Sequence, residues 1–400
     1  MPDVIVVGGG PAGLHAATLL ARQGWDVTLF EEHREPGEPV HCTGVLAAEA
    51  YDELDIPREP VLNTLSQVRF FAPSGDVVSY TTPEIEALVI DRRLFDHQLH
   101  LTALSAGVRV VAGARVTNVV SAPAGVTVSF AEGPDAQARA CILACGANYV
   151  LQRRIGLGMP AVFLQSAQVE WPAAPLDAVE VHFGHRVAPS GFAWVVPVQR
   201  GASPMARIGL MCEGSAAQHF RTLVARVAGR WGLDAAAGSD ASGEPRLKML
   251  PLAPLRKTYA DRILAVGDAA GLVKATTGGG IYYSLVSAGL AADVLGHALT
   301  ADALAEKDLA PYQRLWRKRL GPELDAQLSL RLLANRFTDE EIDSLFDLAQ
   351  TDGIMPIVRR TARFNRHREL ILSLFRHPPA RRLFFRRLTS RRQTALNRTP

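Results

Sequence analysis

Two hydrophobic periodicities follow one another in the first 31 residues. Residues 4–7 form a continuous apolar run, which is typical of a fully buried parallel strand. From residue 11 to residue 23 the apolar positions recur at helical spacing, and Gly24 is a C-terminal stop signal. A second apolar run covers 27–30. The pattern predicts a strand, helix and strand with a glycine-rich first turn.

Beyond this unit, short stretches of strand-like alternation are separated by two helical segments. Strands are expected at 67–71, 77–80, 108–111, 116–120, 126–130, 141–144 and 262–266, with more between 161 and 212, and helices at 91–106 and 280–299 and through most of the remainder. The pattern predicts an α/β fold, in which a Rossmann-type dinucleotide-binding domain carries an inserted antiparallel β-sheet substrate domain and is followed by a C-terminal helical region. The first domain is expected in 1–60, 91–160 and 256–300, the inserted domain in 61–90 and 161–255, and the helical region with its basic tail in 301–400.

Composition agrees with a folded protein of more than one core. A chain of 400 residues exceeds the roughly 250–300 residues that one core serves, and 48% hydrophobic with 21% charged residues argues against disordered or fibrous classes. No stretch approaches the roughly 18 apolar residues of a spanning helix, and the start lacks a basic signal-peptide region, so a cytoplasmic protein is expected. The four cysteines lack zinc-site or disulfide-scaffold spacing, and we expect no metal: Cys42, Cys141, Cys145 and Cys212.

Positive charge is concentrated at the end of the chain. Residues 356–400 hold 13 of the 43 lysines and arginines but 1 of the 40 acidic residues. Arginines alternate there with apolar residues, which favours peripheral attachment to an anionic membrane. A basic helix packed on the acidic body is the alternative. Nucleic-acid binding is not expected, because no nucleic-acid fold accompanies the tail.

The first glycine-rich turn has the spacing of a dinucleotide site. Gly8 permits a tight turn, Gly10 lets the backbone approach a pyrophosphate, and Gly13 lets helix and strand pack closely. Ala12 belongs to the same turn, whose following helix offers free amides to phosphate. Glu31, at the end of the next strand, is placed to accept hydrogen bonds from an adenosine ribose and disfavours a 2′-phosphate. The turn predicts FAD or NAD.

A second glycine-rich turn selects FAD. Residues 266–271 read Val-Gly-Asp-Ala-Ala-Gly, and Asp268 ends a strand where it can bond a hydroxylated chain. Gly279, Gly280 and Ile281 then open a long helix, whose N-terminus stabilises negative charge on reduced flavin. A helix-capping turn with Asp268 as N-cap is the structural alternative.

With these motifs the chain resembles the geranylgeranyl reductase family, within the flavoproteins of p-hydroxybenzoate hydroxylase architecture, over roughly residues 1–300. Residues 37–44 are similar to the family's Pro-x-x-Cys segment beside the flavin, so the resemblance implies flavin contacts from Cys42, Thr43 and Gly44. Residues 91–96 resemble its Arg-x-x-Phe-Asp helix start. The resemblance also implies FAD contacts from Arg92 and, through the backbone near the adenine, from Val116.

A further stretch, 189–197, resembles the family signature Pro-x-Gly-Tyr-x-Trp-x-Phe-Pro, associated with the prenyl-chain cavity. Phe192 and Trp194 are the implied substrate-binding residues, and their two-residue spacing places both on one face of a strand. Three positions depart from the family pattern. Phe192 replaces tyrosine, Val196 replaces phenylalanine, and Cys145 stands where relatives have aspartate.

The resemblance implies an FAD-dependent oxidoreductase that reduces carbon–carbon double bonds of a geranylgeranyl or other polyprenyl group on a lipid, quinone or related isoprenoid. Cys42 is its implied catalytic residue, gating the pocket or assisting proton delivery, and a small buried hydrophobe is the structural alternative. No second GxGxxG is present, so the electron donor, NAD(P)H or a ferredoxin, is expected to bind transiently. A flavin-dependent monooxygenase or halogenase remains the alternative enzyme, and a flavin-binding electron-transfer module the non-catalytic one.

Overall fold

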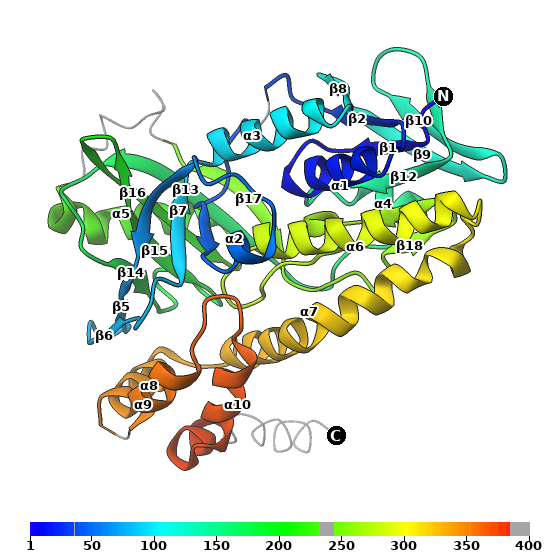
Figure 1. The fold of residues 1–400 in the computed structure, drawn as a ribbon. Helices are drawn as coiled ribbons and strands as arrows, with labels where there is room; N and C mark the ends of the chain where they lie inside the picture. Colours follow the sequence, from blue (N-terminus) through cyan, green and yellow to red (C-terminus); the bar gives the residue numbers. More distant parts are fainter. Residues whose placement is uncertain (36, 233–243, 352, 385–400) are drawn as a thin grey trace, which may run out of the picture.

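The computed structural model describes residues 1–35, 37–232, 244–351 and 353–384, which form two sheet-based lobes and a helical region (Figure 1). The first lobe is built on a six-stranded sheet in the order β18-β19-β12-β1-β2-β8. Its strands are β1 (Val4–Val7), β2 (Val27–Glu31), β8 (Arg109–Ala112), β12 (Ala140–Leu143), β18 (Tyr259–Ala260) and β19 (Ile263–Ala265).

The predicted strand, helix and strand at the N-terminus are confirmed. β1 lies in the middle of the sheet, pairs in parallel with β2 and β12, and is buried along its whole length. One face of the sheet carries α1 (Pro11–Arg22), which packs between α3 (Arg92–Ser105) and α6 (Ile281–Thr300). A three-stranded sheet of β9 (Val116–Ala122), β10 (Gly125–Phe130) and β11 (Ala136–Ala138) lies against β1 and β12, and α4 (Val150–Arg154) packs on β9.

The second lobe is a seven-stranded sheet in the order β17-β13-β16-β15-β14-β5-β6. It is antiparallel as predicted except that β5 and β14 run parallel. One face is covered by α5 (Ala216–Trp231), which follows the predicted strand region 161–212 and for which no element was predicted. The strands are β5 (Gln67–Phe71), β6 (Val77–Thr81), β13 (Phe163–Pro172), β14 (Val179–His182), β15 (Phe192–Arg200), β16 (Ser203–Cys212) and β17 (Arg246–Pro251).

Residues 61–90 divide between two sheets. The hairpin of β5 and β6 joins the seven-stranded sheet. In contrast, β7 (Ala87–Ile90) is the central strand of a three-stranded sheet and pairs with β3 (Val45–Ala47) and β4 (Val61–Leu65). The chain passes from the first lobe into the second through this small sheet. Helix α2 (Ala50–Glu53) follows directly after β3. The sheet places the segment just before β3 between the two lobes.

The C-terminal region is helical, as predicted. It contains α7 (Glu306–Ala334), α8 (Asp339–Thr351), α9 (Ile354–Thr361) and α10 (Arg368–Arg376). Ile371 is buried, and Ala380 and Phe384 are buried in one apolar cluster with Leu333 of α7. The described part of the basic tail therefore packs on the body of the protein. The predicted apolar and basic residues Phe385, Arg386, Arg387, Leu388, Arg391 and Arg392 lie outside the described residues.

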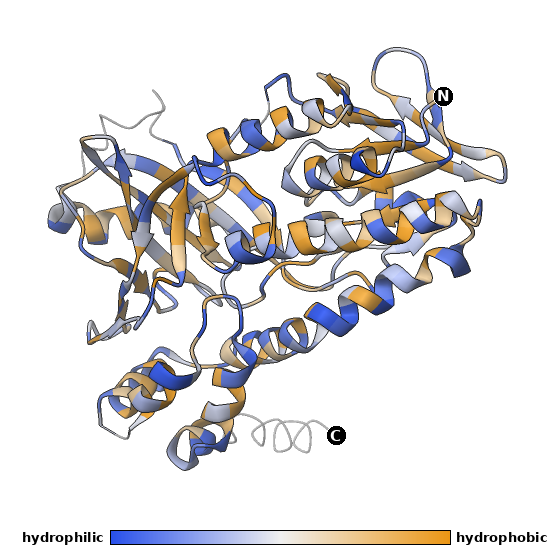
Figure 2. Ribbon diagram, in the orientation of Figure 1, coloured by the Kyte–Doolittle hydropathy of each residue, from blue (hydrophilic) through white to orange (hydrophobic). Residues whose placement is uncertain are grey.

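Hydropathy follows this architecture. Apolar residues concentrate along the strands and on α6, while α7 alternates between polar and apolar positions (Figure 2). Among the described residues, no helix combines the length and the apolar character needed to cross a membrane.

Candidate active site

One large cavity of about 1010 Å³ lies between the two lobes. The carboxyl ends of β1 and β2, the start of α6, one face of the seven-stranded sheet and the segment after α9 all contribute to its lining. The structure thereby brings together all but one of the predicted site residues, Gly13 being the exception: Gly8, Gly10, Ala12, Glu31, Cys42, Thr43, Gly44, Arg92, Val116, Phe192, Trp194, Asp268, Gly279, Gly280 and Ile281.

The first glycine-rich turn has the predicted geometry. Gly8 has a φ of +108°, a backbone conformation that side chains strain. A Cβ atom at Gly13 would overlap the carbonyl oxygen of Gly8, so this glycine permits the close packing of α1 on β1. A Cβ atom at Gly10 would meet nothing within 4 Å, because the position opens onto the cavity. The bare backbone at Gly10 is thus explained by a ligand and not by the protein's own packing.

Glu31 is held in place beside this turn. Its Oε2 accepts a hydrogen bond from the amide of Gly9 at 2.6 Å, and its Oε1 accepts one from the amide of His33 at 2.8 Å. The carboxylate therefore fixes the conformation of the turn as well as facing the cavity. This arrangement suits the role predicted for it at an adenosine ribose.

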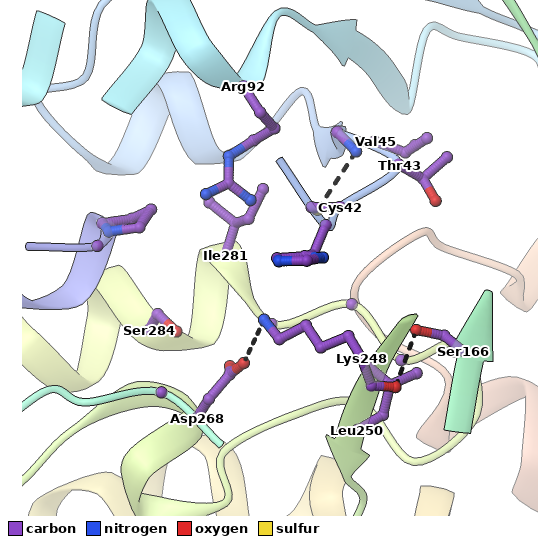
Figure 3. Close-up of a pocket in the computed structure, with 18 of the residues that line it drawn as sticks. Cys42, Thr43, Val45, Arg92, Ser166, Lys248, Leu250, Asp268, Ile281 and Ser284 are labelled. Carbon is purple, nitrogen blue, oxygen red and sulfur yellow. Dashed lines mark hydrogen bonds and ion pairs between the residues drawn. The ribbon is translucent and has the colours of Figure 1, made fainter. Parts of the chain in front are cut away.

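At the second turn, the carboxylate of Asp268 meets a cation from the neighbouring sheet inside the cavity. The carboxylate of Asp268 pairs with the ammonium of Lys248 on β17 at 3.3 Å, and Lys248 extends across the cavity in Figure 3. The short 3₁₀ helix of this turn, Gly267–Ala270, has Val266 as its N-cap, so Asp268 is not the N-cap that the structural alternative required. Gly280 precedes α6 without a side-chain cap, so the amides at the start of this helix face the cavity unsatisfied.

Cys42, Thr43 and Gly44 form a short segment, here called the Cys42 loop. The amide of Gly44 donates to the Sγ of Cys42 at 3.3 Å, and the hydroxyl of Thr43 donates to Gln168 at 2.6 Å. Arg92 lies beside this loop at the start of α3 and pairs with Asp96 at 2.8 Å. Burial disfavours the charge of Arg92, but the neighbouring Asp96 and Cys42 outweigh it and raise the pKa of the guanidinium.

The seven-stranded sheet supplies an apolar wall, and its register confirms that Phe192 and Trp194 share a face. One cross-strand row runs over all seven strands and contains, in order, Val78, Phe70, Val181, Trp194, Gly209, Gln168 and Arg246. Phe70, Val181 and Trp194 line the cavity, together with Phe192 two residues along β15. The opposite face of the sheet packs on α5.

The segment 362–367 after α9 forms part of the cavity wall, which no pattern in the sequence predicted. Ala362, Arg363, Phe364 and His367 line the cavity, although they lie more than 80 residues after the second turn. The ring nitrogen Nδ1 of His367 is 2.7 Å from the hydroxyl of Thr276. Part of the basic tail is therefore a wall of the site.

Lys274 joins this segment to the second turn. Its Nζ donates to the carbonyl oxygen of Phe364 at 3.1 Å and to Oδ1 of Asn365 at 3.0 Å, and it lies 4.2 Å from the centre of the Phe364 ring. Burial lowers the pKa of Lys274 to about 7. The side chain therefore loses its proton near neutral pH, far below the pH at which an exposed lysine does, and its Nζ has hydrogens for both acceptors in either state.

His41 faces the cavity next to the Cys42 loop. Burial lowers the pKa of this imidazole to about 4, and the charges of Lys248 and Arg246 contribute to the shift. The ring is therefore neutral at pH 7. Its Nδ1 is buried without a hydrogen-bond partner among the described residues. Orphaned atoms of this kind are uncommon in folded proteins, and this one belongs to a residue of the cavity wall.

These features fit both halves of an FAD molecule. The bare Gly10 backbone, the carboxylate of Glu31 and the start of α1 would hold the adenosine diphosphate half. Asp268 and the uncapped start of α6 would hold the ribityl chain and the flavin ring. The Cys42 loop and the wall of the seven-stranded sheet lie at the flavin half of the same cavity.

Comparison with known proteins agrees with this geometry. The family description of pyridine nucleotide-disulphide oxidoreductases matches residues 2–168. The fold resembles a geranylgeranyl bacteriochlorophyll reductase-like protein from Thermoplasma acidophilum, with a TM-score of 0.81, 22% identity and coverage of 94% of this chain and 96% of that one. It also resembles a variant of the halogenase PltM in complex with FAD, with a TM-score of 0.66, 15% identity and coverage of 96% and 85%.

Fold and site together define an FAD-dependent oxidoreductase. Digeranylgeranylglycerophospholipid reductase 2 of Methanothermobacter thermautotrophicus is 30% identical over 86% of this chain and 90% of its own length. Digeranylgeranylglycerophospholipid reductase of Methanocaldococcus jannaschii is 30% identical over 88% and 92%. The chain belongs to this geranylgeranyl reductase family, as the sequence motifs indicated.

Proposed function

We propose that the protein reduces carbon–carbon double bonds in a polyprenyl group of a lipid, quinone or related isoprenoid. The observation that carries the proposal is the continuity of the cavity. Its flavin half, at Asp268 and the start of α6, opens directly onto the apolar wall of Phe70, Val181 and Trp194. A linear hydrocarbon on this wall reaches the reactive end of the cofactor.

Burial of the chain supplies the binding energy. Each methylene that leaves water contributes about 0.8 kcal/mol, so a long prenyl chain binds without polar contacts along its length. Phe192 and Trp194, whose ring centres are 5.7 Å apart, offer a rigid surface on which such a chain is oriented. FAD, when bound and reduced by the electron donor, would supply the hydride for one carbon of the double bond.

The second carbon requires a proton, and the position of the Cys42 loop at the cavity wall supports its proposed role as the donor. The thiol of Cys42 lines the cavity, and the amide of Gly44 holds its sulfur at 3.3 Å. The neutral His41 precedes it in the chain and faces the same space. We therefore propose Cys42 as the catalytic residue, with His41 next to it.

Anaerobic turnover tests the proposed function. The holoenzyme is reduced with dithionite, freed of excess reductant, and mixed with geranylgeranyl lipids, alcohols and quinones, and the products are analysed by mass spectrometry. Reduction predicts a gain of two hydrogens per bond together with reoxidation of the flavin. A product that gains oxygen or halogen, formed in air with reductant, would instead identify the monooxygenase or halogenase chemistry of more distant structural relatives.

The electron donor is proposed to bind transiently, since the described residues provide one dinucleotide turn at the end of β1, which FAD uses. NAD(P)H and ferredoxin are the two candidates. Anaerobic mixing of the oxidised holoenzyme with each donor distinguishes them, because the competent donor bleaches the flavin absorbance within the turnover time.

Peripheral membrane contact is proposed at the tail side of the cavity. Val358, Ala362 and Arg363 line the cavity there, and Arg359, Arg360 and Arg366 nearby are exposed. Exposed arginines attract an anionic lipid surface, which would bring the apolar cavity to its substrate.

A further inference from the structure

Arg207 on β16 is a buried arginine that the proposed chemistry leaves unexplained. It is 3% exposed and lies on the cavity side of the sheet, directly opposite Val196 on β15 and Glu170 on β13. Charged side chains are almost never buried to this extent unless they are paired. The guanidinium pairs with Glu170 at 2.6 Å.

The remaining hydrogen bonds of Arg207 leave the sheet. Its Nη1 donates to the carbonyl oxygen of Thr43 at 2.5 Å and to the carbonyl oxygen of Ile90 at 2.9 Å. Thr43 is the middle residue of the Cys42 loop, and Ile90 ends β7 just before α3. One side chain of the substrate lobe thus holds both segments that carry the flavin-facing residues Cys42 and Arg92.

Two neighbours confirm that the contact is built into the fold. A Cβ atom at Gly44 would lie 2.5 Å from Nη1 of Arg207 and 2.6 Å from the carbonyl oxygen of Ile90, so the glycine makes room for the guanidinium. Gln168, which accepts the hydroxyl hydrogen of Thr43, stands in the same cross-strand row as Trp194. The loop is therefore tied to the wall on which the substrate is expected to lie.

We infer that Arg207, assisted by Gln168, is the positioning residue of the Cys42 loop and sets the access and orientation of the Cys42 thiol. The inference deepens the proposed function and rests on it for its catalytic meaning. Arginine suits the task because its planar fork reaches two carbonyl oxygens and a carboxylate at once, whereas lysine is a single point charge.

The chain offers a matched control for this contact. Arg200 on β15 binds the same carboxylate, Glu170, and also pairs with Asp91 at 2.5 Å. Its hydrogen bonds within the described part of the chain go to these two carboxylates and not to residues 42–44. Arg207→Lys keeps a positive charge beside Glu170 but removes the guanidinium that donates to the carbonyl oxygens of Thr43 and Ile90. Arg200→Lys disturbs the same charge network and leaves the loop contact intact.

The test measures the alkylation rate of Cys42 by iodoacetamide in the FAD-loaded enzyme between pH 7 and 9.5, with peptides resolved by mass spectrometry. Cys145 lies outside the loop but in the same cavity, and burial raises the pKa of its thiol to about 11, so it reports the background rate in the same sample. R207K is expected to raise the Cys42 rate at least fivefold with the Cys145 rate unchanged, and R200K to leave both within twofold. Because no substrate is present, the result is independent of whether the protein reduces prenyl groups.

The inference is overturned if R207K leaves the Cys42 rate unchanged, or if R200K raises it as much as R207K does. Should R207K fail to give folded holoenzyme, Gln168→Leu keeps the ion pairs and removes the other bond to Thr43. Q168L is then expected to raise the Cys42 rate selectively, and an unchanged rate in that variant overturns the inference equally.

Discussion

The indole ring of Trp194 lies across Gly209 on the neighbouring strand, where a Cβ atom would approach its Cζ2 to 2.5 Å. The glycine thus lets the largest side chain of the apolar wall lie against the sheet. Any side chain at 209 would push the ring into the space that the prenyl chain is proposed to occupy.

Gly209→Ala is therefore expected to weaken substrate binding while FAD binding is retained. Overpacking of this kind costs about 1–3 kcal/mol, which corresponds to a rise in KM of roughly fivefold to 150-fold. Gly229 in α5, where a Cβ would meet nothing within 4 Å, provides the control. G229A should leave KM unchanged, and an equal KM for G209A and the wild type would show that Trp194 is not part of the substrate wall.

Removing the carboxylate of Glu31 should weaken FAD retention. Glu31→Ala frees the amides of Gly9 and His33 and removes the acceptor proposed for the ribose. Charge-assisted hydrogen bonds contribute about 1.5–3 kcal/mol, so the Kd for FAD should rise roughly tenfold to 100-fold. Fluorescence titration of the apoprotein measures this. Glu32→Ala, which removes the adjacent carboxylate, should change the Kd less than twofold.

Cys42→Ala should keep the yellow FAD spectrum and lose turnover. A positioned proton donor contributes about 100-fold or more to the rate, so kcat should fall by that order. Cys212→Ala is the control, since Cys212 is buried in the core between the sheet and α5. That variant should lose stability and keep its kcat at 25 °C. Unchanged turnover in C42A would remove Cys42 from the mechanism.

Lys274 should make stability depend on pH in the alkaline range. Burial lowers its pKa from 10.5 to about 7, against the opposing charges of Glu49 and Glu323. Between about pH 7 and 10.5 the unfolded chain binds a proton that the folded protein does not, so the free energy of unfolding rises with pH. Lys274→Met should flatten this rise relative to the wild type in denaturant titrations. Parallel curves for the two proteins would contradict a neutral Lys274.

Flotation with anionic liposomes should separate two sources of membrane contact. The full chain is compared with a chain that ends at residue 384, which keeps the packed Ile371 and Phe384 and removes 385–400. Five of the tail's arginines fall in the removed part. We expect weaker, salt-sensitive flotation for the shorter chain. Equal flotation would place the contact on the described surface, and no flotation of either chain would refute membrane attachment.

Much of the fold could be predicted because its strongest signals are local. The run 4–7, the turn from Gly8 to Gly13 and the carboxylate of Glu31 lie within one strand, helix and strand, where spacing alone fixes geometry. The shared face of Phe192 and Trp194 follows from the period of two in any strand. No element was predicted between the strands that end at residue 212 and the strand at 262, so α5 was missed, although its buried residues Phe220, Leu223 and Val227 recur at helical spacing.

The sequence by itself determined which residues could hold a dinucleotide, since glycine spacing and a following acid are properties of one continuous segment. Only the tertiary structure decided that Arg207 reaches Thr43, 164 residues away, and that Lys274 meets Phe364, 90 residues away. The hydrogen-bond partners of a buried charged side chain cannot be predicted from the residues next to it in the chain. They are set by which backbone carbonyls the tertiary structure brings near it. For the same reason the basic tail gave no sign along the chain that its first half would become a wall of the cavity.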